Sequence, residues 1–166
     1  MAIIPNQLTI MSWNVRSLTG ARPYIYKLME TSDVIVISEH RLYDCQLHNL
    51  ESINHNFAVT SKASKSIDDR TCDVRSGIGG IAMFWRNSIG HRIVTMKVNS
   101  DRICAIHVHG DTQNDSLFII GVYLPQIACR ISSYEGEVEV LDKLIWSCRQ
   151  QGEVVVIGDW NCQVTN

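Results

Sequence analysis

The sequence predicts an α/β fold, and three patterns lead to this prediction. Residues 8–38 have the order strand, helix, strand, which is that of a βαβ unit. Residues 92–123 contain three apolar or alternating runs separated by turns, as in an antiparallel meander. Residues 132–161 add a helical pattern followed directly by a strand. We therefore expect strands covered by helices in one domain that spans residues 1–166, with no internal repeat or linker.

The first βαβ unit places two polar side chains at strand ends. A strand is predicted over residues 8–13 and ends at Asn14, and a helix is predicted over residues 22–30. Residues 34–38 form a nearly continuous apolar run, which predicts a strand buried on both faces that ends at Glu39. Because a βαβ connection makes its two strands parallel, we expect Asn14 and Glu39 at the same edge of the sheet.

The middle of the chain is predicted to contain shorter elements. A short helix is expected within residues 40–56, and a brief strand over residues 57–60. Residues 61–76 are polar and are expected to form an exposed loop. The glycines that open the strand predicted over residues 77–85 indicate close backbone packing or a bend.

The end of the chain is the most site-like stretch. A helix is predicted to open at Ser132, and residues 154–157 (Val-Val-Val-Ile) predict a strand buried on both faces. Gly158 is expected to let the chain turn tightly, so that Asp159 and Asn161 stand at the exit of this strand. Two short polar side chains in this relation can face one pocket.

The composition is that of a soluble globular chain and excludes several classes of protein. Of 166 residues, 45% are hydrophobic and 19% are charged. The formal net charge of −2 provides no overall basic field, so a prediction of DNA binding must depend on local patches. The six cysteines include no CxxC pair, which favours a reducing, intracellular compartment over a disulfide framework or a zinc site. The sequence shows neither a membrane span nor the pattern of a signal peptide.

Polar side chains follow four of the predicted strands, and together they suggest a metal site. These side chains are Asn14, Glu39, Tyr123 and the pair Asp159 and Asn161. A single polar residue after a strand is usually a turn former, but ligand sites in α/β sheets gather at the carboxyl ends of strands. Carboxylate and amide oxygens suit Mg²⁺, which engages substrate phosphates. A metal held by carboxylates beside a phenol is typical of phosphodiester cleavage.

Five short motifs support a more specific hypothesis. They are residues 12–18 (SWNVRSL), 37–40 (ISEH), 79–82 (GGIA), 122–125 (VYLP) and 158–161 (GDWN). In this order and spacing they resemble the endonuclease/exonuclease/phosphatase superfamily, and more narrowly the apurinic-type endonuclease domain of non-LTR (LINE-like) retrotransposons. The resemblance covers nearly the whole chain. It implies a DNase I-like fold, which is a four-layer α/β sandwich with two packed sheets.

The resemblance also implies a role for each strand-end residue. Glu39 would hold the divalent metal with Asn14 beside it; Mg²⁺ is the expected ion and Mn²⁺ an alternative. Tyr123 would hydrogen-bond the scissile phosphate. Asp159 would orient or activate the attacking water, and Asn161 would help to bind the phosphate oxygens. The implied reaction nicks one DNA strand and, in such elements, primes reverse transcription, which implies a nuclear location.

The sequence departs from the family pattern at its end. The family has a late Ser-Asp-His motif, whereas this sequence ends at Asn166, five residues after Asn161. We therefore expect an incomplete second sheet and a nicking activity that is impaired or absent. Two alternatives stay open: a non-catalytic relic or interaction domain, which could self-associate through exposed sheet edges, and a phosphatase or phosphodiesterase that acts on a small phosphorylated substrate.

The histidines are not assigned to catalysis. His107 and His109 are one residue apart on a predicted strand, so they share a face, and we expect that face to be exposed to solvent. His40 follows Glu39 directly and is expected to point the opposite way.

Two arginines are candidates for DNA contact. Arg16 follows Asn14 closely enough to contact a phosphate, for which a guanidinium is well suited. Arg86 opens a modestly basic patch over residues 86–102. An ordinary solvated surface is an equally good interpretation of that patch.

Overall fold

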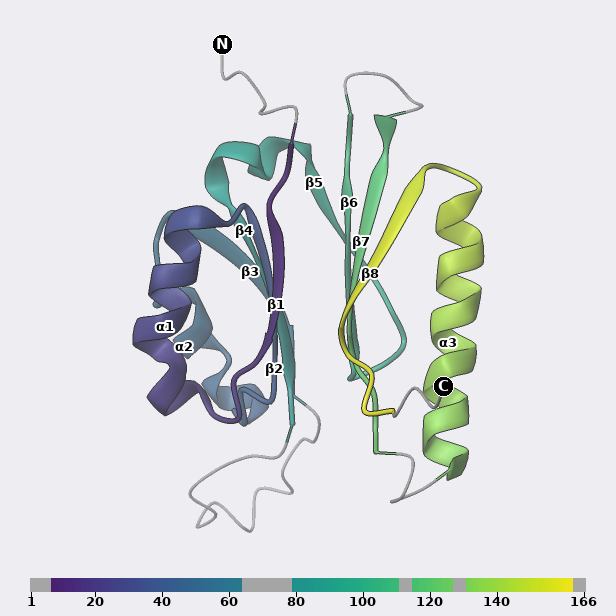
Figure 1. The fold of residues 1–166 in the computed structure, drawn as a ribbon, viewed down its shortest axis with the longest axis horizontal. Helices are drawn as coiled ribbons and strands as arrows, with labels where there is room; N and C mark the ends of the chain where they lie inside the picture. Colours follow the sequence, from purple (N-terminus) through teal and green to yellow (C-terminus); the bar gives the residue numbers. More distant parts are fainter. Residues whose placement is uncertain (1–6, 64–78, 111–114, 127–130, 163–166) are drawn as a thin grey trace.

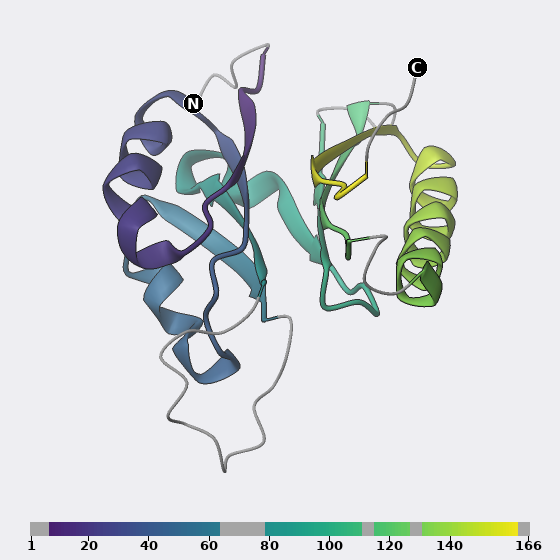
Figure 2. The same cartoon turned by 60° about the horizontal axis from the view of Figure 1, so that its bottom comes forward.

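The computed structural model describes residues 7–63, 79–110, 115–126 and 131–162, and its layers follow the order helix, sheet, sheet, helix (Figure 1). Two four-stranded sheets pack face to face; α1 and α2 cover the outer face of the first sheet, and α3 covers that of the second. Figure 2 shows the same layers from a second direction. The elements are β1 (Ile10–Asn14), α1 (Leu18–Thr31), β2 (Val34–Ser38), η1 (Asp44–Gln46), α2 (His48–Glu51), β3 (Phe57–Lys62), β4 (Ile81–Arg86), η2 (Asn87–Arg92), β5 (Ile93–Met96), β6 (Ile103–Val108), β7 (Leu117–Tyr123), α3 (Ile131–Arg149) and β8 (Glu153–Asp159). The predicted fold class, a two-sheet α/β sandwich, is confirmed.

The first sheet has the strand order β1-β2-β4-β3, in which β1 and β2 are parallel and the other pairs are antiparallel. The register pairs Ile10 with Val34 and Asn14 with Ser38. Asn14 and the residue after Ser38, Glu39, therefore leave the sheet at the same edge. This confirms the placement that the βαβ pattern predicted.

The second sheet has the order β5-β6-β7-β8. Its first three strands form the predicted antiparallel meander, and β8 then pairs with β7 in parallel after the α3 crossover. Tyr123 is the register partner of Asp159. Each sheet thus contains one parallel pair, and the two parallel pairs supply the strand ends that bear polar side chains.

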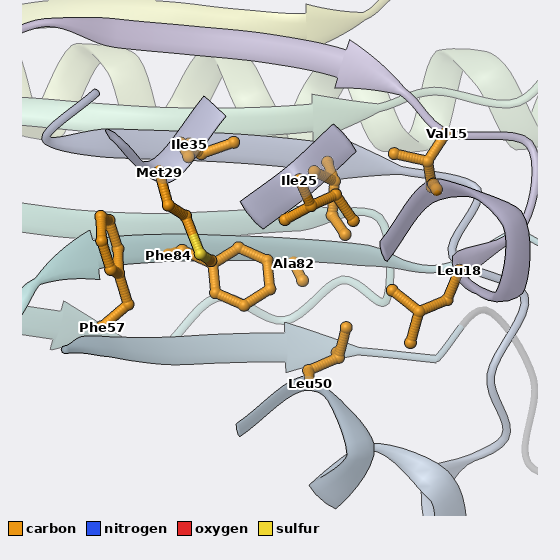
Figure 3. Close-up of a cluster of buried hydrophobic side chains, with 11 residues drawn as sticks. Val15, Leu18, Ile25, Met29, Ile35, Leu50, Phe57, Ala82 and Phe84 are labelled. Carbon is orange, nitrogen blue, oxygen red and sulfur yellow. The ribbon is translucent and has the colours of Figure 1, made fainter. Parts of the chain in front are cut away.

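The buried side chains form a separate cluster between each two layers. Between α1 and the first sheet, Ile25 and Met29 pack with Ile35 and Phe84 (Figure 3). Val36, on the other face of β2, belongs to the cluster between the two sheets. All four apolar residues of β2 are therefore fully buried, as the continuous apolar run predicted.

The same argument gave a wrong prediction for β8. Among the described residues β7 is the only strand that pairs with β8, so β8 lies at the edge of its sheet. Val154 and Val156 pack toward α3, but Val155 on the opposite face is 37% exposed. An apolar run reports which side chains can be buried, and it does not specify how many strands lie beside them.

Two helix starts also differ from the prediction. The first helix begins at Leu18 rather than at residue 22, because Leu18 and Ala21 already contribute buried side chains to its inner face. The last helix begins at Ile131, one residue before the predicted start at Ser132. Most of the polar loop predicted over residues 61–76 lies outside the described residues, and β3 continues through Lys62.

Gly158 does not form the predicted tight turn. The strand continues through it to Asp159, and its φ of +146° is accessible mainly to glycine. A Cβ atom at this position would overlap the carbonyl oxygen of Val122 in β7. Glycine is therefore required for the close approach of two backbones, and Asp159 still emerges beside Tyr123.

Gly80 has no room for a side chain because it lies against the imidazole of His40. Its φ is +91°, and a Cβ atom would overlap the ring. His40 is buried; its Nδ1 accepts the backbone N–H of Leu42 at 3.1 Å, and its Nε2 lies 3.2 Å from the carbonyl oxygen of Lys62. Burial lowers the pKa of His40, so the ring stays neutral and connects the exit of β2 to the end of β3. His40 thus packs against Gly80 inside the fold and takes no part in a polar cluster with Glu39.

No helix in the described part of the chain is long and apolar enough to cross a membrane.

Replacement of Gly80 by alanine should lower the free energy of unfolding by about 1–3 kcal/mol. The new methyl group would overlap the imidazole of His40, and alanine is strained at the positive φ of this position. Urea denaturation followed by circular dichroism measures this change. The matched control is Gly136→Ala in α3, where a Cβ atom meets nothing within 4 Å and which should stabilise by up to about 1 kcal/mol. Equal stability of the two variants would contradict the packing described for Gly80.

Candidate functional site

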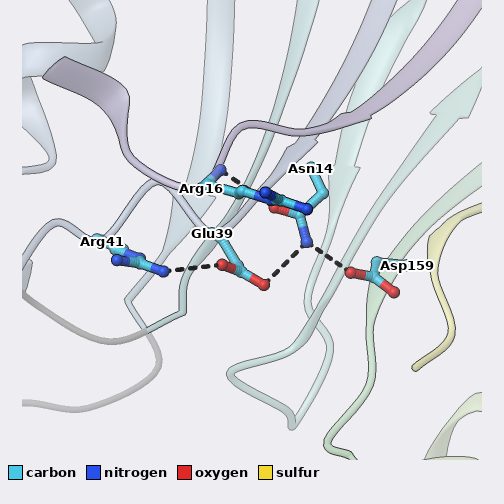
Figure 4. A network of polar contacts seen from close by, with 5 residues as sticks. All are labelled: Asn14, Arg16, Glu39, Arg41 and Asp159. Carbon is cyan, nitrogen blue, oxygen red and sulfur yellow. Dashed lines mark hydrogen bonds and ion pairs between the residues drawn. The ribbon is translucent and has the colours of Figure 1, made fainter. Parts of the chain in front are cut away.

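The side-chain amide of Asn14 joins two carboxylates at the edge where the two sheets meet. Its Nδ2 donates one hydrogen bond to Glu39 Oε1 at 2.8 Å and one to Asp159 Oδ2 at 2.7 Å (Figure 4). The three residues lie at the ends of β1, β2 and β8. Three of the side chains that the sequence nominated therefore form one network that links both sheets.

The backbone around this network is held in a conformation that most residues avoid. In the described part of the chain, the non-glycine residues with positive φ are Arg16, Glu39, Arg41 and Asn161, with φ between 46° and 59°. All four lie in the segments that leave β1, β2 and β8. Each such residue costs about 1–3 kcal/mol and persists only where its surroundings enforce it. This concentration of strain beside the network is typical of a functional site.

Hydrogen bonds hold the strained segments in place. Asn14 Oδ1 accepts the backbone N–H of Arg16 at 3.1 Å, which closes a tight turn after β1. The backbone N–H of Glu39 donates to the carbonyl oxygen of Gly80 at 2.8 Å, and that of Arg41 donates to Gly79 at the same distance. Glu39 is thus fixed by the glycine pair that precedes β4.

Tyr123 lies beside the acidic pair as a neutral phenol. Burial is the main cause that raises its pKa, and the negative charges of Glu39 and Asp159 raise it further, while Arg102 opposes them. The guanidinium of Arg102 lies 5.3 Å from the centre of the Tyr123 ring and hydrogen-bonds its carbonyl oxygen at 3.5 Å. The phenol therefore keeps its proton at neutral pH and can donate a hydrogen bond.

Asn161 helps to hold the carboxylate of Asp159 in place. Its backbone N–H donates to Asp159 Oδ1 at 3.1 Å, and its Nδ2 donates to the carbonyl oxygen of Leu124 at 2.8 Å. Both oxygens of Asp159 thus accept hydrogen bonds, one from Asn14 and one from Asn161. Contact of Asn161 with a phosphate stays a prediction.

Two site residues were not identified from the sequence. Arg41 Nη2 lies 3.3 Å from Glu39 Oε2, in an ion pair whose arginine side chain is 43% exposed. Arg102 had been counted only as part of a basic patch. A signal existed for both: Arg41 follows Glu39 by two residues, and hairpin pairing of β6 with β7 places Arg102 opposite Tyr123.

The two arginines proposed for DNA contact are not brought together. Arg16 lies beside Asn14, at the network. Arg86 lies at the other end of β2, next to Asp33 and away from the network, and its contact with DNA stays a prediction. Its contacts are the Asp33 carboxylate at 3.5 Å, the carbonyl oxygens of Met29 and Ser32, both at 2.8 Å, and the Phe57 ring at 5.0 Å. Arg86 thus stabilises the turn between α1 and β2.

The histidine pair on β6 is only partly exposed to solvent. His109 is exposed, as predicted. His107 is half-buried, because its ring stacks on Phe118 at 4.2 Å and lies 3.9 Å from that of His109. Its Nε2 is buried with no partner among the described residues. Burial, followed by the neighbouring His109, lowers the pKa of His107.

The chemistry of the donor atoms in the network fits a hard divalent cation. Glu39 and Asp159 present carboxylate oxygens within 3 Å of one nitrogen atom, and Asn14 adds an amide oxygen. Mg²⁺ is commonly held by one or two carboxylates together with water and substrate phosphate. Among the described residues no cluster of three or more histidine, cysteine or acidic side chains could hold a metal.

Comparison with known proteins identifies relatives by structure alone. No protein-family model and no curated protein sequence matches the chain. The catalytic domain of Xenopus laevis APE2 superposes with a TM-score of 0.69 at 17% identity, covering 96% of this chain and 62% of that one. The Neisseria 3′ phosphatase NExo, bound to a product DNA hairpin, superposes with a TM-score of 0.65 at 18% identity. The match covers 93% of this chain and 58% of that one. TDP2 from D. rerio, complexed with a single-strand DNA product, superposes with a TM-score of 0.64 at 16% identity. The match covers 96% of this chain and 63% of that one.

At these identities the likeness establishes the fold, and the chain spans about three fifths of the length of these structures. The chain has the DNase I-like fold that the motifs predicted. The solved structures that it resembles include a 3′ phosphatase, a 3′-5′ exonuclease and a 2′,3′-cyclic phosphatase.

Proposed function

We propose that the protein hydrolyses phosphodiesters with a bound divalent metal, Mg²⁺ or Mn²⁺, and that it nicks one strand of DNA. The observation that carries this proposal is the Asn14 amide that joins the carboxylates of Glu39 and Asp159 at one edge of both sheets. Tyr123 and Arg102 lie beside this network, so an acidic metal-binding centre adjoins a hydrogen-bond donor and a cation.

Each residue has a role that follows from its position. Glu39 and Asn14 would hold the metal, which supplies Lewis-acid activation of the phosphate when bound. Asp159, fixed at both oxygens, orients the attacking water and accepts its proton. Tyr123 donates a hydrogen bond to a non-bridging phosphate oxygen, and Arg102 stabilises the negative charge that develops there.

DNA as the substrate is supported by the motifs and by two structural neighbours that contain product DNA. A retroelement as the source is supported by the motifs alone. A nuclear location follows from the same resemblance. Metal and DNA binding are measured alongside nicking, so that the site can be located even where turnover is slow.

A small phosphorylated substrate is the second candidate, favoured by the net charge of −2. Hydrolysis of p-nitrophenyl phosphate esters by the same site, without plasmid nicking, would favour it over the DNA substrate.

Self-association would involve the β8 edge, where Val155 and Trp160 are exposed. Light scattering over a range of protein concentrations tests that part.

Removal of either carboxylate charge should abolish the function. Asp159→Asn should lower the rate of plasmid nicking in Mg²⁺ by about 10²–10⁴-fold, because the amide cannot accept the proton of the water. Glu39→Gln should weaken Mn²⁺ binding, measured by isothermal titration calorimetry, by about tenfold or more. The control is Glu139→Gln, an exposed carboxylate on α3 that pairs with Lys143.

Nicking and Mn²⁺ binding that are unchanged in both site variants would show that the site assignment is wrong. Lost Mn²⁺ binding in Glu39→Gln, in a protein that nicks too slowly to assay, would still locate the metal site.

Replacement of Arg41 by alanine should tighten Mn²⁺ binding by about two- to fivefold, because the arginine neutralises Glu39 and repels a cation at the same carboxylate. Calorimetry measures the change. Lys143→Ala, which removes a comparable ion pair on α3, should leave Mn²⁺ affinity as it is. Weaker Mn²⁺ binding in Arg41→Ala would mean that the arginine organises the site instead of competing with the metal.

A further inference from the structure

A hollow of about 200 Å³ opens next to the candidate site, between the end of β1 and the first turns of α1. The residues that line it include Trp13, Arg16, Gly20 and Tyr24. Neither the metal site nor the scissile phosphate requires this hollow. Its lining is mainly apolar, whereas the neighbouring network is acidic.

The two rings form a preorganised aromatic surface. Trp13 and Tyr24 pack edge to face, with ring centroids 6.2 Å apart at 77°. Trp13 is partly buried against the cluster beneath α1, which holds the pair in position. Tyr24 is 63% exposed, so one of its faces is available to a ligand. Gly20 lines the hollow, and a Cβ atom there would meet nothing within 4 Å, so this position has room for a larger side chain.

The hollow adjoins the network along the chain. Trp13 directly precedes Asn14, and the backbone of Arg16 is tied to Asn14 Oδ1 by the turn after β1. Within the described ranges, no acceptor binds the guanidinium of Arg16, and this exposed residue lines the hollow, so its positive charge is available to a ligand. A chain of nucleotides that crosses the acidic centre would therefore meet the aromatic pair and a free positive charge together.

A second hollow nearby fits such a chain less well. It is lined by Lys62, Asp44 and Asp101 among others. The Lys62 ammonium already donates to the carbonyl oxygens of Val98 and Ser100, and the two carboxylates repel phosphate. The aromatic hollow is the better candidate for a nucleic-acid contact.

We propose that the aromatic hollow binds one unstacked nucleobase of the DNA strand that flanks the scissile phosphate. The base lies against the Tyr24 and Trp13 rings, and Arg16 binds the phosphate of the same nucleotide. Stacking on aromatic rings accepts any base, so this subsite selects for an unpaired or flexible nucleotide and not for a sequence. The inference rests on the proposed DNA substrate and specifies its structure: a base that has left the duplex stack is favoured.

Two variants test the subsite without disturbing the network. Gly20→Leu fills the hollow, and leucine favours the helix more than glycine does, so the variant should fold. Tyr24→Ala removes the exposed stacking face. The matched controls are Gly136→Leu in α3, where a Cβ atom also meets nothing, and Tyr26→Ala, another exposed tyrosine on α1.

The probe is a fluorescein-labelled DNA duplex with one unpaired 2-aminopurine, placed in turn at each position around the nick, and binding is measured in Ca²⁺. Anisotropy should show that Gly20→Leu and Tyr24→Ala weaken binding by about 5- to 100-fold, while the controls stay within about twofold. Tyr24→Phe should bind like the wild type. Quenching of 2-aminopurine should occur at one flanking position and be lost in both hollow variants.

Each other outcome overturns a distinct claim. Site variants that bind like their controls, in a protein that binds and nicks DNA, overturn the base-binding hollow and leave the proposed function intact. A wild-type protein that binds Mn²⁺ through Glu39 but binds none of the duplexes overturns the DNA substrate and the hollow together.

Discussion

The architecture of the site depends on one amide placed between two carboxylates. Glu39 and Asp159 emerge from different sheets, and without Asn14 they would face each other as like charges where the sheets meet. The amide hydrogens of Asn14 offset that repulsion and fix the ends of β1, β2 and β8 relative to one another. Arg41 and Arg102 add positive charge on either side. Two carboxylates whose oxygens converge on one nitrogen atom are suited to a divalent cation, and this property links the fold to the proposed chemistry.

The surrounding chain is built to keep that centre rigid. Left-handed backbone at Glu39 and Asn161 is unfavourable by itself, and it is maintained by the contact between Gly80 and His40 on one side and by the hydrogen bond to Leu124 on the other. Gly158 lets β8 approach β7 closely enough for Asp159 to stand beside Tyr123. The local strain is therefore supported by packing that lies just beneath the site, and the acidic side chains keep their geometry without a ligand.

Much of this could be predicted because it depends on local patterns. The βαβ periodicity placed Asn14 and Glu39 at one edge, and the apolar run of β2 predicted its burial on both faces. Contacts between distant segments were harder to predict. The bond from Asn14 to Asp159 joins residues 145 positions apart, and the edge position of β8 depends on neighbours that its own residues do not specify. A count of charges cannot reveal that Asp33 and two carbonyl groups already bind Arg86, away from the network. The aromatic hollow depends on how α1 packs against β1, which no motif encodes.

The most direct test of the account is anomalous X-ray diffraction from a crystal soaked in Mn²⁺, recorded at the manganese absorption edge. We expect one strong anomalous peak at coordinating distance from Glu39 and Asn14, with the Asn14 amide rotated so that its oxygen faces the ion. A peak at another place in the molecule, or no peak at this edge of the sheets at saturating Mn²⁺, would contradict the claim that these residues form a metal-dependent phosphodiester-cleaving site.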